Sequence, residues 1–291
     1  METSDKTKVK IRFNDLPISK CTQNGLSKSK YLKMTEVQRA SIPHGLGGRD
    51  IVCCARTGSG KTLSYLVPVV ETLYRARWSA LDGLGALILV PTRELGIQVF
   101  EVLRSFAGLH DLSCALVIGG RDLDVEREHI QSMNIIIATP GRLLQHFDET
   151  SSFNGSSLKI LVIDEVDRIL DMGFKQQVDE IVQALPRKIQ TLLFSATITK
   201  SLKDLARLNL NNPEFIQIHN FDQVEQKATE PTENDDAPLE LKQVTPLTLL
   251  HYYMELNIDE KLDMLFSFLK LHQKQKILVF FSSRKQVRFA Y

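Results

Sequence analysis

The residues of this 291-residue chain that are best suited to chemistry are two glycines and a lysine that follow an apolar run. The run, residues 51–54, is typical of a buried strand, and a helix beginning at Lys61 would add its positive N-terminal end. The glycines let backbone N–H groups curl around phosphate oxygens. The eight residues after the run are Ala55, Arg56, Thr57, Gly58, Ser59, Gly60, Lys61 and Thr62. This order predicts binding of a nucleoside triphosphate with Mg²⁺, with Lys61 at the outer phosphates and the Thr62 hydroxyl on the metal.

Carboxylates follow a second apolar run about a hundred residues later. Residues 158–163 are typical of a buried parallel strand, and the next four residues are Asp-Glu-Val-Asp. Carboxylates at the end of a parallel strand, beside a phosphate loop, are suited to Mg²⁺. We therefore predict that Asp164 holds the metal through water and that Glu165 orients or deprotonates the attacking water. The alternatives are a Gly/Ser turn at the first segment, where Ala55 replaces the usual glycine, and a solvated helix start at the second.

The order of these motifs resembles that of the DEAD-box ATP-dependent RNA helicases, with the box spelled Asp-Glu-Val-Asp. The resemblance implies that the hydroxyls of Ser195 and Thr197 bond to Asp167, the last residue of the box, and connect the nucleotide to the RNA. Val166 replaces the family's alanine, and we expect the chain to tolerate its two extra methyl groups. If the site is tightly packed, overpacking would instead cost roughly 1–3 kcal/mol.

The same resemblance identifies an adenine-binding segment near the N-terminus. Residues 30–38 are similar to the family's Q motif, with Gln38 as its glutamine, although Lys30, Tyr31 and Met34 depart from the common pattern. One amide can both donate to and accept from the adenine edge. Phe13 stands seventeen residues before Lys30 and is expected to stack on the base.

Three further motifs follow apolar runs, and so are expected at the same edge of the sheet as the phosphate loop. Their residues are Pro91, Thr92, Arg93, Gly119, Gly120, Thr139, Pro140, Gly141 and Arg142. The arginines suit backbone phosphates, and the small residues let main-chain N–H groups approach a strand. No residue among them reads a base edge. The motifs therefore predict contact with the backbone of single-stranded RNA or a short duplex, with little sequence specificity, and the family's members bend one strand to disrupt the duplex.

Strands alternate with amphipathic helices from about residue 50 to 220, which predicts an α/β fold with a RecA-like doubly wound parallel sheet. We expect helices over 63–73, 94–106, 122–131 and 174–184. The expected domains are the Q-motif region with the N-terminal RecA-like ATP-binding domain at 1–221, an acidic linker at 222–245, and the start of a C-terminal helicase domain at 246–291.

The last segment predicts an incomplete second RecA-like domain. We expect strands at 251–256 and 276–281, and helices over 259–272 and from 283 onward. A whole domain would need roughly a hundred more residues. An arginine supplied in trans is worth roughly 10³–10⁵ in the rate of related phosphoryl transfers. We therefore expect this chain alone to bind ATP weakly, to hydrolyse it slowly and not to unwind RNA.

Charge and composition favour a nucleic-acid partner and exclude a membrane protein. Residues 222–240 hold seven acidic side chains and one basic one, which leaves +7 on the rest of a chain whose net charge is +1. A basic body suits phosphate-rich partners. The acidic segment is expected to be a solvated tether, the alternative being a tail that competes with RNA. No apolar run reaches the ~20 residues that span a membrane, and the cysteines are expected to be reduced packing residues (Cys21, Cys53, Cys54 and Cys114).

These observations predict an ATP-dependent RNA helicase that uses ATP and Mg²⁺ to unwind or remodel short RNA duplexes. Strings such as residues 167–174 are similar to nucleolar members of the family that process ribosomal RNA, which implies pre-rRNA as the substrate, ribosome-assembly proteins as partners and the nucleus or nucleolus, otherwise the cytoplasm, as the location. Two alternatives stay open: a nucleotide-dependent RNA-binding or regulatory protein that lacks helicase activity, and a P-loop ATPase that acts on DNA or protein.

Overall fold

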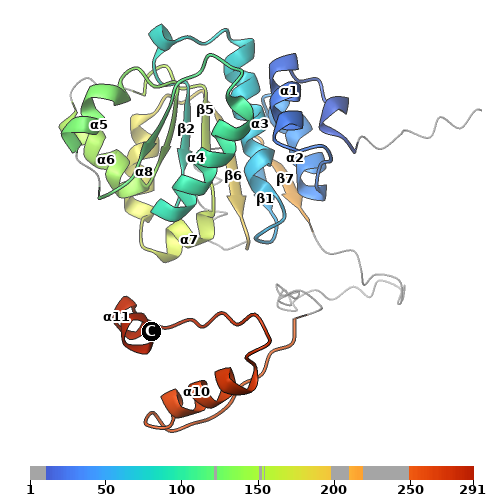
Figure 1. Cartoon of the computed structure of the whole chain (residues 1–291). Helices are drawn as coiled ribbons and strands as arrows, with labels where there is room; N and C mark the ends of the chain where they lie inside the picture. The colour runs from blue at the N-terminus through green and yellow to red at the C-terminus, as the bar shows by residue number, and fades with distance from the viewer. Residues whose placement is uncertain (1–10, 121–122, 151–152, 154, 198–209, 219–248) are drawn as a thin grey trace, which may run out of the picture. The chain divides into compact units, whose positions relative to one another are not determined.

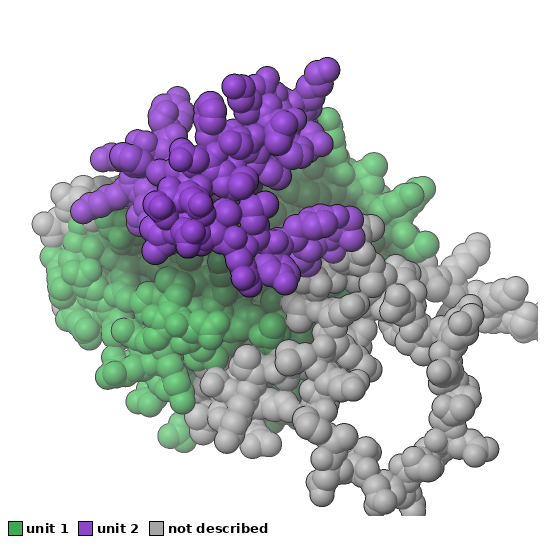
Figure 2. Space-filling model, turned by 90° about the horizontal axis from the view of Figure 1, so that it is seen from below, with its two compact units in different colours: residues 1–232 green, residues 233–291 purple. Residues whose placement is uncertain are grey.

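The computed structural model describes residues 11–120, 123–150, 153, 155–197, 210–218 and 249–291. The chain divides into two compact units, unit 1 at Met1–Thr232 and unit 2 at Glu233–Tyr291, which are coloured separately in Figure 2. Each unit is described on its own. The expected acidic linker at 222–245 lies outside the described residues, so its boundaries stay a prediction.

Unit 1 is built on a seven-stranded sheet in which every neighbouring pair of strands is parallel (Figure 1). The strand order is β3-β4-β2-β5-β6-β1-β7. The strands are β1 (Ile51–Cys54), β2 (Ala86–Leu89), β3 (Cys114–Val117), β4 (Ile135–Ala138), β5 (Ile160–Ile163), β6 (Gln190–Ser195) and β7 (Glu214–Gln217). Four of them, β1, β2, β4 and β5, are buried along their whole length, as expected for apolar strands covered on both faces. The predicted doubly wound parallel fold is confirmed.

Helices cover both faces of this sheet. They are α1 (Lys20–Lys28), α2 (Glu36–Leu46), α3 (Lys61–Arg75), α4 (Arg93–Ala107), α5 (Leu123–Ile130), α6 (Pro140–Glu149), α7 (Val166–Asp171) and α8 (Lys175–Ala184), with short 3₁₀ turns η1 (Phe13–Asp15) and η2 (Ala80–Asp82). One apolar cluster joins the sheet to α1–α4, and a second joins its other face to α5–α8. The four helices predicted in this unit are all present, with ends that differ by at most two residues.

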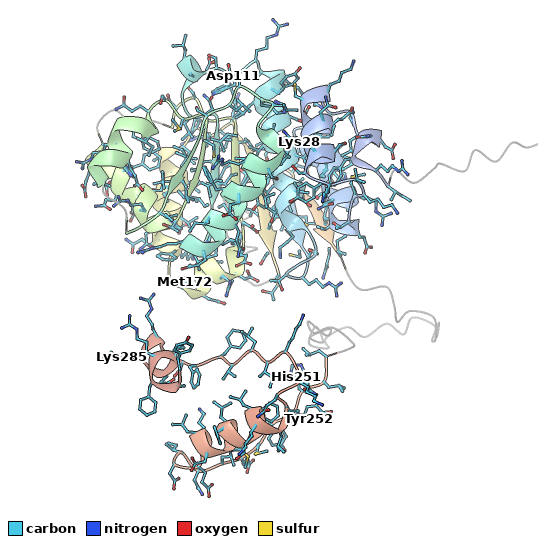
Figure 3. All side chains as sticks on the ribbon, viewed as in Figure 1. Lys28, Asp111, Met172, His251, Tyr252 and Lys285 are labelled. Carbon is cyan, nitrogen blue, oxygen red and sulfur yellow. The ribbon has the colours of Figure 1, made fainter. Side chains whose placement is uncertain are left out.

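Unit 2 contains α10 (Lys261–Leu271) and α11 (Arg284–Ala290), which agree with the predicted helices. The two predicted strands are wrong, because residues 251–256 and 276–281 form no strand. A strand forms its hydrogen bonds only with a neighbour, and no described residue pairs with either segment. Their side chains are open to solvent: Tyr252, labelled in Figure 3, is 88% exposed, and Phe280 is 85% exposed.

No helix in the described ranges combines the length and the apolar composition that crossing a membrane requires. All four cysteines are free, and Cys53 and Cys54 are buried within β1. These two thiols have raised pKa values, about 12 for Cys53 and about 11 for Cys54, chiefly because burial disfavours the thiolate. Protonated thiols at these positions agree with the predicted packing role.

A close backbone contact holds α1 against α4. A Cβ atom on Gly25 would lie 1.8 Å from the carbonyl oxygen of Phe106. Main-chain atoms cannot rotate away, so the approach of the two helices requires glycine here.

We expect Gly25→Ala to separate these helices and to lower the free energy of unfolding by about 1–3 kcal/mol. Urea denaturation of the purified chain measures this. The control is Gly108→Ala, whose new Cβ would meet the Arg104 carbonyl oxygen at an ordinary 3.5 Å. Equal effects of the two substitutions would contradict the close-packing explanation.

A buried polar cluster fastens α1 to the helix that begins at the phosphate loop. Glu71 of α3 accepts hydrogen bonds from the Ser19 N–H at 3.0 Å and from the Thr22 hydroxyl at 2.5 Å. Because this uses the hydroxyl proton of Thr22, His110 must donate its Nε2 proton to Thr22 Oγ1, 2.9 Å away. The His110 Nδ1 is buried without a hydrogen-bond partner among the described residues. His110 precedes Asp111, labelled in Figure 3.

Burial lowers the pKa of His110, and the nearby Glu71 opposes this shift. In the unfolded chain this histidine has a pKa of about 6.5, so as the pH falls it is protonated there before it is protonated in the folded chain. The contribution of His110 to the free energy of unfolding is therefore full above about pH 6.5 and decreases below it. We expect the free energy of unfolding to fall less between pH 7.5 and 5.5 in His110→Gln than in the wild-type chain, as measured by urea denaturation. Identical pH profiles would rule out this role for His110.

Candidate nucleotide and RNA site

The phosphate loop connects β1 to α3 at the carboxyl edge of the sheet. Gly58 and Gly60 have φ angles of +77° and +94°, a left-handed region that glycine enters without strain. Ser59 Oγ is buried and has no hydrogen-bond partner among the described residues, so it is available to a phosphate oxygen. The remaining loop residues range from buried to exposed: Ala55 is buried, Arg56 and Thr57 are exposed, and Thr62 is half-buried. This local geometry fits the predicted phosphate site.

Lys61 points into the loop. Its side chain is 7% exposed, and Nζ donates to the carbonyl oxygen of Ala55 at 2.6 Å and reaches that of Ser195 at 3.5 Å. These carbonyl oxygens accept hydrogen bonds from the buried ammonium group, which would destabilise the fold if it had no partner. The lysine thus connects the end of β1 with the end of β6 at the position expected for the outer phosphates.

The predicted adenine-binding residues are tied into the protein. Gln38, 4% exposed, donates from Nε2 to the Gly60 carbonyl oxygen at 2.9 Å and accepts at Oε1 from the Thr35 N–H at 2.8 Å. A Cβ on Gly60 would lie 2.7 Å from that Nε2. Gln38 therefore fastens α2 to the phosphate loop. Phe13 is 1% exposed within the first apolar cluster, so protein side chains cover its ring. Stacking of Phe13 on adenine and recognition of adenine by Gln38 stay predictions.

Asp164 lies at the end of β5 and is 3% exposed. Its Oδ2 accepts the Tyr65 O–H at 2.8 Å, and its Oδ1 accepts the Glu165 N–H at 2.9 Å. Burial raises the pKa of Asp164 to about 6, although the Tyr65 hydrogen bond and the charge of Lys61 both lower it. Tyr65 is a residue that the sequence reasoning missed. Its position one turn after Lys61 on α3, and so on the same helix face, was the available signal.

The donor set fits Mg²⁺. The Thr62 hydroxyl and the Asp164 carboxylate are hard oxygen ligands, the kind this ion prefers. No group of three His, Cys, Asp or Glu side chains that could hold a metal occurs among the described residues, so phosphates and water would supply the remaining ligands. Mg²⁺ commonly binds in this way, and when bound it would neutralise charge on the phosphates.

Glu165 adopts a left-handed backbone conformation with φ +47° at the start of α7. Such a conformation is strained for a residue with a Cβ and persists where the surroundings enforce it. The carboxylate accepts from Arg168 Nη1 at 2.9 Å, one helical turn along. Arg168 thus holds the side chain that is predicted to act on the attacking water.

Asp167 joins the acidic box to the end of β6. Its Oδ2 accepts from the Ala196 N–H at 3.1 Å, the Thr197 N–H at 3.0 Å and the Thr197 hydroxyl at 3.0 Å. The Ser195 hydroxyl instead donates to the Thr197 carbonyl oxygen at 2.9 Å. The predicted bond from Ser195 to Asp167 is therefore corrected: two main-chain N–H groups take its place. Val166 is fully buried in the second apolar cluster, where its methyl groups pack.

Two of the three predicted RNA motifs meet directly. A Cβ on Gly120 would lie 2.6 Å from Arg93 Nη1, and one on Gly119 would lie 3.0 Å from Nη2. The double glycine therefore makes room for the guanidinium of Arg93, which is exposed. Thr92, after buried Pro91, accepts the Leu95 N–H at 3.2 Å and so caps α4.

The third motif opens α6, with Thr139 at the N-cap and Pro140 in the first turn. Gly141 has open space around its Cα, whereas Arg142 is held inside the protein. Its Nε donates to Glu126 Oε2 at 2.8 Å, and the same oxygen lies 3.0 Å from His146 Nε2. The side chains of Arg142 and Glu126 are only 9% and 11% exposed, and that of His146 is fully buried. The sequence reasoning missed Glu126 and His146, although the four-residue spacing of Arg142 and His146 places them on one helix face.

A DEAD/DEAH box helicase model matches residues 35–205, which is more than half of the chain. The chain belongs to the DEAD/DEAH box helicase family. It resembles a crystal structure of a DEAD box protein from the hyperthermophile Methanococcus jannaschii, with a TM-score of 0.69 and 30% identity over 96% of this chain and 69% of that one.

Curated relatives of this DEAD/DEAH box chain carry specific names. It is 52% identical to "Probable ATP-dependent RNA helicase ddx10" of Dictyostelium discoideum and 50% identical to "Probable ATP-dependent RNA helicase DDX10" of Homo sapiens, over 96% of this chain and 30% of each relative. It is 49% identical to "ATP-dependent RNA helicase dbp4" of Schizosaccharomyces pombe, over 96% of this chain and 35% of that protein. The chain thus spans about a third of the length of these relatives.

We expect Asp167→Asn to lower the free energy of unfolding by about 1–3 kcal/mol. Both carboxylate oxygens accept hydrogen bonds, Oδ1 from the Arg168 N–H at 3.0 Å and Oδ2 from residues 196 and 197, so in either orientation the amide N–H₂ of asparagine would face a donor. Chemical denaturation measures the loss. Asp171→Asn, at an exposed position of the same helix, is the matched control and should change little. A stability equal to that of the control would contradict the role given to the Asp167 cluster.

Proposed function

We propose that this chain provides the ATP-binding half of an ATP-dependent RNA helicase that uses ATP and Mg²⁺ to unwind or remodel short RNA duplexes. The observation that carries the proposal is the contact of Asp167 with residues 196 and 197. It connects the acidic box to a segment at the end of β6, beside the strand that leads into the phosphate loop. The names of the relatives, all ATP-dependent RNA helicases, support the same activity.

In the nucleotide half of the site, Lys61 and the loop N–H groups would hold the phosphates, and Thr62 and Asp164 would hold Mg²⁺. Glu165 would orient or deprotonate the attacking water. The Asp167 cluster makes the position of Thr197 depend on the acidic box, because a shift of either segment breaks several hydrogen bonds together.

In the RNA half, Arg93 beside Gly119 and Gly120 is suited to a backbone phosphate. Thr139 and Gly141 provide a helix start whose N–H groups suit a second phosphate. Arg142 would contribute only if RNA competes with Glu126 for its guanidinium. These residue types favour contact with the RNA backbone and not with the edges of the bases.

The more specific parts of the proposal come from the likeness to nucleolar family members. They are pre-rRNA as the substrate, ribosome-assembly proteins as partners and the nucleus or nucleolus as the location. The second candidate is a nucleotide-dependent RNA-binding or regulatory protein without helicase activity. This second candidate is favoured by one observation: the side chains of Lys61, Gln38 and Arg142 already form hydrogen bonds with other residues of the protein.

Steady-state ATP hydrolysis by the 291-residue chain tests the proposal, with and without single-stranded RNA and with the second helicase domain of a close relative added in trans. We expect RNA and the added domain together to raise turnover. Glu165→Gln should keep ATP binding and lower turnover by roughly 10²–10⁴-fold, whereas Lys61→Ala should lose binding.

The other outcomes separate the alternatives. ATP and RNA binding without turnover under any of these conditions would favour the regulatory protein. Fast ATP hydrolysis by the chain alone, unchanged by RNA, would contradict the helicase assignment and support a self-contained P-loop ATPase. Arg93→Gln should weaken RNA binding without affecting ATP binding. This result would show that RNA binds at the predicted edge of the sheet.

A further inference from the structure

Tyr65 occupies a central place between three elements of the nucleotide site. It lies on α3 and is fully buried, and its O–H donates to Asp164 Oδ2 at 2.8 Å. Thr62 lies three residues before Tyr65 on the same helix. The ring meets Phe194 of β6 edge-on, with 5.2 Å between ring centroids. The phenol therefore ties α3, the helix that carries Thr62, to Asp164, and Thr62 and Asp164 are the two side chains suited to Mg²⁺.

Packing alone does not explain a tyrosine at this position. A phenylalanine would keep the ring contact with Phe194 and the burial within the first apolar cluster. A hydroxyl taken out of water is costly unless it is hydrogen-bonded, so its presence among apolar neighbours depends on the bond to Asp164. The hydroxyl must therefore be explained through this carboxylate.

The effect on Asp164 follows from its surroundings. The carboxylate is almost completely buried, and the Tyr65 O–H and the Glu165 N–H hold its two oxygens in place. The Glu165 bond comes from the next residue in the chain, whereas Tyr65 reaches across from a helix 99 residues away in sequence. The phenol thus fixes how the carboxylate faces the phosphate loop.

We propose that Tyr65 is a positioning residue that sets the Mg²⁺ affinity of the nucleotide site by holding the Asp164 carboxylate in place. The inference rests on the proposed function, because it requires Asp164 to act on a nucleotide-bound metal. Groups that hold metal ligands in this way typically contribute 10–100-fold to metal affinity. With Asp164 acting through water, we expect the lower end of that range.

The test is a titration of Mg²⁺ against the 291-residue chain with a fluorescent, non-hydrolysable ATP analogue. The Mg²⁺ concentration at half-maximal binding is compared with the nucleotide affinity in EDTA. We expect Tyr65→Phe to raise the Mg²⁺ midpoint about tenfold and to leave the affinity in EDTA unchanged. A purely structural role would weaken binding equally with and without the metal.

Tyr74→Phe is the matched control, because Tyr74 lies on the same helix, is 47% exposed and packs edge-on against His110. It should leave the Mg²⁺ midpoint unchanged. A double-mutant cycle adds a second check: in an Asp164→Ala background, which removes the acceptor of the Tyr65 O–H, Tyr65→Phe should have no further effect on the metal dependence.

Several results would overturn the inference. They are an unchanged Mg²⁺ midpoint in Tyr65→Phe, an equal loss of affinity in EDTA, and a full tenfold effect that persists with Asp164→Ala. A wild-type chain that binds the analogue no better with Mg²⁺ than with EDTA would instead contradict the proposed function, and this inference with it.

Discussion

The site depends on the parallel pairing of β6 with β5 on one side and with β1 on the other. The register sets Cys54 beside Ser195, and the Ala55 N–H continues the pairing by donating to the Ser195 carbonyl oxygen at 3.1 Å. Because parallel strands all end at one edge, the phosphate loop, the acidic box and residues 195–197 meet there. Helix α7 and the end of β6 lie at this lower edge of unit 1 in Figure 1. A slip of one residue would turn every side chain of a strand to the opposite face.

Charge burial explains why so many contacts at this edge are internal. Lys61, Asp164 and Asp167 are 7%, 3% and 8% exposed. A buried charge without partners destabilises the fold by several kcal/mol, and each of these groups has partners from another element. Carbonyls of two strand ends surround Lys61, Tyr65 holds Asp164, and residues 196 and 197 hold Asp167. The same contacts that make the charges tolerable also connect the nucleotide residues to the end of β6.

Unit 2 shows what happens when a pattern depends on distant partners. Residues 251–256 and 276–281 have the aromatic and β-branched composition of strands, but they form none. Strand propensity reflects packing on a pleated surface beside neighbouring strands. Helices α10 and α11 do form, since a helix makes its hydrogen bonds within its own segment. Prediction from sequence succeeded here for local hydrogen bonding and failed where a second strand was needed.

The sequence by itself determined the phosphate loop, the acidic box and the alternation of strands and helices in unit 1. These features are local: glycine spacing, apolar runs and helical periodicity act between near neighbours. Only the tertiary structure decided which side chains meet. Ser195 bonds to Thr197 and not to Asp167, Arg142 pairs with Glu126, and Tyr65 reaches Asp164 across 99 residues. The order of the strands in the sheet sets these partners, and no short stretch of sequence contains that order.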